Sequence, residues 1–124
     1  MRSLRRHVAV VDDDESVRES LPDLLRQYGY AVVAFASAEQ FLGSGRLRDF
    51  DCLILDIAMP GMSGPELHRE LSRRGETVPV IFITGHADAN ACATLVREGA
   101  VEVLIKPFSA EDLLSALKVA IPPG

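Results

Sequence analysis

The chain of 124 residues carries a formal net charge of −5, and 48% of its residues are hydrophobic. This length suits one globular domain with its own core, and the acidic balance argues against direct nucleic-acid binding. No apolar run is long enough to cross a membrane and the basic start of the chain lacks a signal-peptide core, so we expect no membrane contact and a cytoplasmic location.

Short apolar runs alternate with segments whose apolar residues recur at helical spacing, which indicates β/α units. In chain order, the predicted elements are a strand at His7–Val11, a helix between Asp14 and Gly29, a strand at Ala31–Phe35, a short helix from Ser37, a strand at Cys52–Leu55, a helix ending near Arg73, a strand at Val80–Ile83, a helix at 88–98, a strand at Val101–Ile105 and a helix from Ser109. Five such units predict one α/β domain with a doubly wound, five-stranded parallel sheet in the order 2-1-3-4-5.

Several residues mark where the predicted helices begin or bend. Asp14 and Ser109 are expected N-caps, because a side-chain oxygen can accept a hydrogen bond from a free amide of the first turn. Ser37, with Gln40 three residues later, predicts a capping box. A proline inside a helix removes one backbone hydrogen bond, so we expect a bend at Pro22.

Polar residues follow four of the five predicted strands at the point where each strand ends. In an open parallel sheet, ligands bind beyond the carboxyl ends of the strands, next to the place where the strand order reverses. The residues at these ends are Asp12, Asp13 and Asp14 after the first strand, Asp56 after the third, Thr84 after the fourth and Lys106 after the fifth. Solvated turn residues are an alternative interpretation for each alone, but their coincidence at one edge favours a binding site.

Carboxylates crowded at this edge need a compensating charge. Two carboxylates about 4 Å apart repel by about 4 kcal/mol at an effective dielectric constant near 20, so either one carboxyl group keeps its proton or a cation binds. Hard carboxylate oxygens favour Mg²⁺, which often joins protein carboxylates to phosphate oxygens. Together with a metal ion, the ammonium of Lys106 and the hydroxyl of Thr84 can contact the oxygens of a phosphoryl group during its transfer. The acceptor of that group would be a carboxylate.

Four stretches resemble the receiver domains of two-component response regulators, and the likeness runs over nearly the whole chain. They are Val10-Val-Asp-Asp-Asp14, Leu55-Asp-Ile-Ala-Met-Pro-Gly-Met-Ser-Gly64, Ile83-Thr-Gly-His86 and Ile105-Lys-Pro-Phe108. The Thr-Gly-His stretch, with the Gly-Ala-Val before the fifth strand, is most similar to the FixJ-type branch. The resemblance implies the flavodoxin-like receiver fold, a receiver domain at residues 1–121 and the start of a linker or tail at 122–124.

By this resemblance, a cognate histidine kinase phosphorylates Asp56, and the domain then switches conformation, dimerisation or partner binding to control an output, here transcription in the parent protein. The chain is not expected to be an enzyme, because at most it catalyses its own phosphorylation and dephosphorylation. The resemblance also implies Mg²⁺ and a phosphorylation-dependent homodimer through the fourth helix and fifth strand. The implied metal ligands are Asp12 through water, Asp13, Asp56 and the carbonyl of Ala58; the implied phosphoryl contacts are Thr84 and Lys106, with a cis bond from Lys106 to Pro107.

Two features depart from the family pattern. Val103 stands where many members carry an aromatic residue that swings inward on activation, and a β-branched side chain has little rotamer freedom. Transmission through the loop and helix after Thr84 is the alternative. Ala58 and His86 occupy positions that tend to gate the hydrolytic water. Alanine cannot orient a water, which indicates a long-lived phosphoryl group. His86 is interpreted as a solvated loop residue, and a water-directing group is the alternative.

Three other functions are compatible with parts of the pattern. A phosphatase or phosphotransferase with an aspartyl nucleophile would carry a second acidic residue where Ala58 stands. A flavin or nucleotide carrier would have a phosphate-cradling loop of Gly, Ser or Thr after the first strand, where three aspartates stand. A binding module that signals by association alone would share the fold, but the presence of all the expected site residues argues against it: Asp12, Asp13, Asp56, Thr84 and Lys106.

Overall fold

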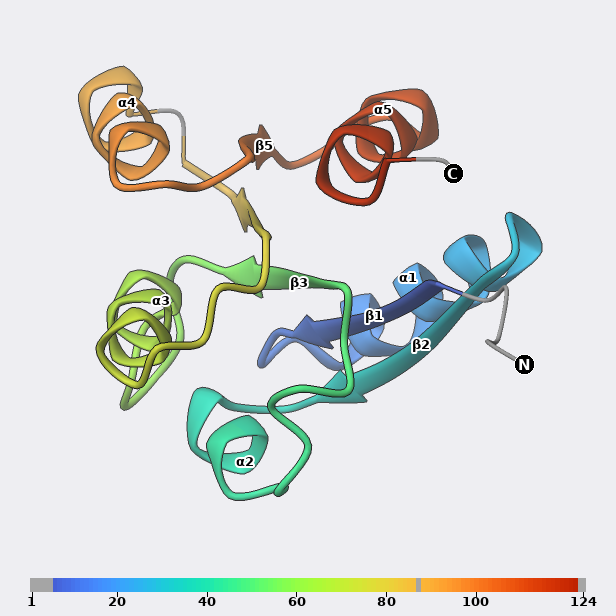
Figure 1. Cartoon of the computed structure of the whole chain (residues 1–124). Coiled ribbons are helices and arrows are strands. Elements are labelled where there is room, and N and C mark those ends of the chain that lie inside the picture. The colour runs from blue at the N-terminus through green and yellow to red at the C-terminus, as the bar shows by residue number, and fades with distance from the viewer. Residues whose placement is uncertain (1–5, 87, 123–124) are drawn as a thin grey trace.

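The structure, a computed structural model, describes residues 6–86 and 88–122, which form strands alternating with helices (Figure 1). The elements are β1 (Arg6–Val11), α1 (Glu15–Gln27), β2 (Tyr30–Phe35), α2 (Ala38–Leu42), β3 (Cys52–Asp56), α3 (Gly64–Arg73), β4 (Val80–Thr84), α4 (Ala89–Arg97), β5 (Glu102–Ile105) and α5 (Ala110–Ala120). None of these helices combines the length and apolar character that a membrane crossing requires. Residues 123 and 124 of the predicted tail lie outside the described residues.

The five strands are parallel and form one sheet in the order β2-β1-β3-β4-β5, which confirms the predicted doubly wound, flavodoxin-like topology. The direction of winding reverses after β2, so the helices are distributed over both faces. α1 and α5 cover one face, and α2, α3 and α4 cover the other (Figure 1). The carboxyl ends of the neighbouring strands β1 and β3 therefore meet at the switch point of the sheet.

Two apolar clusters, one on each face of the sheet, hold the helices in place. Phe41, Leu67 and Leu95 bring α2, α3 and α4 onto one face, and Leu25 and Leu117 bring α1 and α5 onto the other. Every residue of β3 and β4 is buried, as expected of central strands covered on both sides. Each fully buried large apolar side chain contributes roughly 1.5–3 kcal/mol relative to an exposed one, so the sheet is a firm base for the residues at its edge.

The two central strands extend one residue further than predicted, and the added residues are Asp56 in β3 and Thr84 in β4. The register accounts for the extension, because Asp56 pairs with Ile83 and Thr84 pairs with Ile105. The backbone of both polar residues is thus held in the sheet ladder. β5 begins at Glu102, one residue later than predicted.

The predicted N-caps of α1 and α5 both form, but the predicted capping box at Ser37 forms only in half. The hydroxyl oxygen of Ser37 accepts a hydrogen bond from the Gln40 amide at 3.0 Å, as predicted. The side-chain oxygen of Gln40, however, accepts from the backbone N–H of Ala36 at 2.6 Å, because the extended chain before the helix brings that amide within reach. Pro22 is buried inside an unbroken α1, and the bend there stays a prediction.

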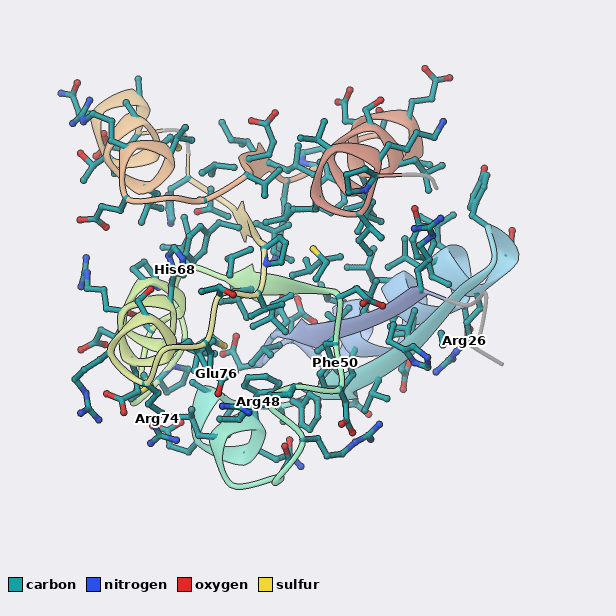
Figure 2. All side chains as sticks on the ribbon, viewed as in Figure 1. Arg26, Arg48, Phe50, His68, Arg74 and Glu76 are labelled. Carbon is teal, nitrogen blue, oxygen red and sulfur yellow. The ribbon has the colours of Figure 1, made fainter. Side chains whose placement is uncertain are left out.

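Two arginine side chains form polar contacts at the margins of the sheet, away from its carboxyl edge. Before the first residues of β3 and β4, Arg48 Nε lies 3.0 Å from Glu76 Oε1, and Figure 2 shows the two side chains together. Arg26 Nη2 donates a hydrogen bond of 2.9 Å to the carbonyl oxygen of Val32 in β2, an outer strand. A surface ion pair contributes about 0–1 kcal/mol and a hydrogen bond about 0.5–1.5 kcal/mol, so most of the stability comes from the two apolar clusters.

Candidate functional site

Three aspartate side chains meet at the carboxyl edge of the sheet. Asp12 and Asp13 follow the last residue of β1, and Asp56 ends β3, which pairs with β1. One carboxylate oxygen from each of the three lies within 4.8 Å of the other two. Asp12 is fully buried and Asp56 is 6% exposed, whereas Asp13 is exposed. The acidic group expected from the strand ends is therefore present, with one of its members in contact with solvent.

Lys106 brings a positive charge to this group from the loop after β5. Its Nζ lies 3.2 Å from Asp12 Oδ2 and 4.0 Å from Asp56 Oδ1. Its backbone N–H donates a hydrogen bond of 2.7 Å to the carbonyl oxygen of Thr84, so β4 fixes the start of the lysine side chain. The peptide bond to Pro107 is cis, as expected. One ammonium group thus contacts the two buried carboxylates of the site, with the closer contact to Asp12.

Asp12 is held on several sides by hydrogen bonds. Its Oδ1 accepts from the backbone N–H of Asp14 at 2.9 Å, and its Oδ2 accepts from Lys106. Its own N–H donates to the carbonyl oxygen of Phe35 at the end of β2, and its carbonyl oxygen accepts from the guanidinium of Arg18, both at 3.1 Å. A fully buried carboxylate requires such partners, and here they fix its position.

Asp56 has fewer compensating contacts, and its pKa is raised from 3.8 to about 6. The main cause is burial, which disfavours the charged form, followed by the negative charge of Asp12; the ammonium of Lys106 acts in the opposite direction. Three carboxylates around one ammonium leave an excess of negative charge. The site is therefore poised to gain a proton or a cation at Asp56.

The donor atoms of this site fit Mg²⁺. Carboxylate oxygens from Asp12, Asp13 and Asp56 converge within a space that one ion can share, and Mg²⁺ binds oxygen ligands while keeping several waters. The exposure of Asp13 leaves a side through which those waters and a ligand can approach. Ala58 is an exposed residue of the loop after β3, and the metal-binding role of its carbonyl stays a prediction.

Thr84 is the last residue of β4, the strand that pairs with β3 and hence with Asp56. It is 4% exposed, and it follows Ile83, the residue that pairs with Asp56. Its hydroxyl oxygen accepts a hydrogen bond of 3.1 Å from the backbone N–H of His86. The hydroxyl is therefore tied to the start of the loop that leads to α4. The side chain of His86 is exposed, in agreement with its interpretation as a solvated residue.

Two further residues shape the site, and sequence analysis did not identify either of them. Gly64 is buried at the start of α3, where a Cβ atom would overlap the backbone carbonyl oxygen of Asp56. Glu39, in α2, accepts a hydrogen bond of 2.9 Å from the backbone N–H of Met62 in the loop after β3. The Met-Ser-Gly stretch indicated a turn, but contacts between segments distant in sequence cannot be read from local patterns.

An α/β sheet wound in this order, with aspartates and a lysine at its switch point, defines a class of small signalling domains. The family model of the response regulator receiver domain matches residues 8–118. The chain therefore belongs to the response regulator receiver domain family.

Its relatives agree with the FixJ-type resemblance. Response regulator protein TmoT of Ectopseudomonas mendocina is 42% identical over 114 residues, which cover 92% of this chain and 52% of that protein. Nodulation protein W of Bradyrhizobium diazoefficiens is 43% identical over 118 residues, covering 95% and 52%. Transcriptional regulatory protein FixJ of Azorhizobium caulinodans is 41% identical over 114 residues, covering 92% and 54%. The chain spans about half the length of the curated relatives it matches.

Solved structures give the same result. The response regulator StyR superposes with a TM-score of 0.87 at 43% identity, over 94% of this chain and 59% of that one. The structure titled FixJ-N gives a TM-score of 0.83 at 38% identity, over 97% of this chain and 94% of that one. The receiver fold predicted from the sequence is thereby confirmed.

Proposed function

We propose that this chain is a receiver domain that takes a phosphoryl group from a histidine kinase onto Asp56, in a reaction that requires Mg²⁺. The observation that carries the proposal is the buried Asp56 carboxylate, which lies among Asp12, Asp13 and Lys106 and lacks full charge compensation. The proposed domain covers residues 1–121, acts in the cytoplasm and has no catalytic turnover of its own beyond gain and loss of the phosphoryl group.

In the proposed reaction, a carboxylate oxygen of Asp56 attacks the phosphorus atom of a phosphohistidine. The new bond is an acyl phosphate oxygen–phosphorus bond; the phosphorus–nitrogen bond breaks, and the imidazole nitrogen keeps the electron pair. Lys106 and Thr84 stabilise the charge that spreads over the phosphoryl oxygens. When bound, Mg²⁺ would neutralise part of that charge; its proposed protein ligands are Asp12 through water, Asp13, Asp56 and the Ala58 carbonyl.

The position of Lys106 supports its proposed role. Its ammonium group already lies between Asp12 and Asp56, at 3.2 and 4.0 Å. In the proposed reaction, a rotation of the flexible side chain exchanges the Asp12 contact for a phosphoryl oxygen, while the lysine backbone stays hydrogen-bonded to β4. The protein thus needs little rearrangement to bring a positive charge to the transferred group.

The proposed output begins at Thr84. If its hydroxyl oxygen moves toward a phosphoryl oxygen, the hydrogen bond that it accepts from the backbone N–H of His86 lengthens, and the loop before α4 is less tightly held. Val103, half-buried in β5, is smaller than the aromatic residue that many family members carry at this position and has no ring to swing inward. The signal therefore passes through the loop and α4.

The exposed side chains of Val96 in α4 and Ile105 in β5 offer apolar surface for the proposed homodimer. Control of transcription would belong to the rest of the parent protein.

Incubation with acetyl phosphate and Mg²⁺, followed by intact-mass measurement, tests the proposal. The chain is expected to gain the mass of one phosphate, and to gain none when a chelator removes divalent ions. The transferred group leaves acetate behind, so no other reactant is needed. A chain that gains no phosphate with Mg²⁺ present would contradict the proposal and favour a module that signals by association alone.

The phosphoryl lifetime depends on the residue at position 58. Alanine at this exposed position offers no group that can orient water toward the acyl phosphate. Ala58→Asn supplies an amide there, and we expect dephosphorylation to become about tenfold faster, because a positioned water reacts more readily. The decay of the phosphorylated mass after donor removal measures this rate. Ala58→Val is the control, since it adds bulk without a polar group; equal decay in the Ala58→Asn variant and the parent would refute the prediction.

A further inference from the structure

A carboxylate of α2 reaches across to the loop that follows Asp56. Glu39 Oε2 accepts a hydrogen bond of 2.9 Å from the backbone N–H of Met62, twenty-three residues further along the chain. Met62 belongs to the segment 57–63, which joins β3 to α3 and carries Ala58. The contact therefore links a helix outside the acidic group to the loop proposed to complete it.

The fit of Glu39 against this loop is close. Gly61 has a φ of +74°, and a Cβ atom built on it would lie 2.6 Å from Glu39 Oε2. Glycine is the residue that adopts such a backbone conformation without steric cost, and here its missing side chain also makes room for the carboxylate. Two successive loop residues thus accommodate Glu39: Gly61 leaves space for its carboxylate, and Met62 donates its backbone N–H to it.

Buried apolar residues hold both α2 and the β3–α3 loop in place around this contact. Ala38 and Phe41, on either side of Glu39 in α2, are fully buried, and Met59 in the loop is 8% exposed within the same apolar cluster. At its two ends the loop is joined to the sheet and to α3, because Ile57 donates to the Ile83 carbonyl and accepts from the Gly64 amide. Glu39 adds a third attachment, at Met62, near the end of the loop that leads into α3.

We propose that Glu39 is a positioning residue for phosphoryl transfer, which acts by holding the β3–α3 loop in the conformation that the Mg²⁺ site requires. This inference rests on the proposed function. Without the Met62 hydrogen bond, the loop samples more conformations, and the carbonyl of Ala58 is less often in place. The expected effect is a weaker response to Mg²⁺, with Asp56 itself unchanged.

Three variants test this role. Glu39→Ala removes the acceptor, whereas Glu39→Gln keeps a side-chain oxygen at the same reach. Gln40→Ala is the matched control, because Gln40 also accepts a backbone hydrogen bond, from Ala36 at 2.6 Å, but within the start of its own helix. A purely structural role in α2 predicts similar effects of Glu39→Ala and Gln40→Ala, and a positioning role predicts different ones.

The first measurement is hydrogen exchange of the Met62 amide, followed by NMR in metal-free protein. In Glu39→Ala this exchange is expected to be about tenfold faster, the factor expected for the loss of one hydrogen bond. Glu39→Gln and Gln40→Ala are expected to exchange at close to the parent rate. Parent-like exchange in Glu39→Ala would overturn the proposed clamp whatever the phosphorylation result.

The second measurement is the rate of phosphate gain from acetyl phosphate at increasing Mg²⁺ concentration. Glu39→Ala is expected to need about three to ten times more Mg²⁺ for half of its maximal rate, and Glu39→Gln is expected to restore most of the response. If the parent chain gains phosphate and Glu39→Ala matches it at every Mg²⁺ concentration, the positioning role fails while the proposed function stands. If the parent gains no phosphate, both are overturned.

Discussion

Replacing Asp56 with asparagine is expected to abolish phosphate gain from acetyl phosphate. The amide cannot act as the nucleophile that forms an acyl phosphate, and the other carboxylates of the site have different positions. Asp12 is fully buried and bonded to Asp14 and Lys106, so its oxygens are already engaged. Intact mass after incubation with donor and Mg²⁺ measures the loss. Full phosphate gain in the Asp56→Asn variant would place the acceptor elsewhere.

The same change, Asp56→Asn, is expected to stabilise the metal-free protein near pH 7.5. Because the folded-state pKa of about 6 lies above the usual aspartate value of 3.8, which holds in the unfolded chain, the native state binds more protons than the unfolded state between these values. The parent therefore loses stability as pH rises through this window, and asparagine removes that loss. The gain at pH 7.5 should be roughly 2–3 kcal/mol, and it should disappear below about pH 4, where the carboxyl group is protonated in both states.

Urea unfolding in the presence of a chelator, at pH 7.5 and at pH 4, measures this difference. Asp14→Asn is a suitable control, because Asp14 is exposed and asparagine also serves well as an N-cap. The pKa of Asp14 is lowered, chiefly by its hydrogen bonds to Ser16, so its replacement should not stabilise the protein at neutral pH. Equal stability of the parent and the Asp56→Asn variant at pH 7.5 would contradict the raised pKa of Asp56.

Replacing Gly64 with alanine is expected to be among the most destabilising single substitutions in this domain. The added Cβ would overlap the carbonyl oxygen of Asp56 and press against the backbone of Ile57. Backbone atoms of a central strand cannot move aside as a flexible side chain can, so α3 or the end of β3 must shift. Overpacking typically costs 1–3 kcal/mol, and for this backbone contact we expect about 3 kcal/mol or more.

The control for Gly64→Ala is Gly85→Ala. Gly85 is exposed, and a Cβ built on it has no atom within 4 Å, so its replacement should change the free energy of unfolding by less than about 0.5 kcal/mol. Urea unfolding compares the two variants. A chain with Gly64→Ala that unfolds at the same urea concentration as the chain with Gly85→Ala would show that the close approach at Asp56 is relieved at little cost.

The sheet and most of the acidic site could be predicted from the sequence because both depend on short-range patterns. Apolar runs define the strands, and the first polar residue after each run marks the edge where ligands bind. The same reasoning placed Asp56 and Thr84 just outside their strands, whereas the register includes both. A polar side chain at the end of an apolar run can remain in the ladder when its neighbour strand extends far enough to pair with it.

Contacts between distant segments could not be predicted in this way. The preference of Lys106 for Asp12 over Asp56 depends on less than 1 Å of difference between two distances, 3.2 and 4.0 Å. The contact of Glu39 with Met62 requires α2 and the β3–α3 loop to pack side by side. Helical period and turn composition describe each segment alone, so they contain no information on this packing.

The hydrogen bond from Arg26 to the Val32 carbonyl affects how copies of this domain can associate. An outer strand usually offers free backbone groups to which a neighbouring molecule can add a strand, a route to uncontrolled aggregation. On β2, a guanidinium occupies one of these acceptors, which discourages strand addition along that margin. The other outer strand, β5, has the exposed side chain of Ile105 at its end, so the two margins of the sheet present different chemistry to a neighbouring molecule.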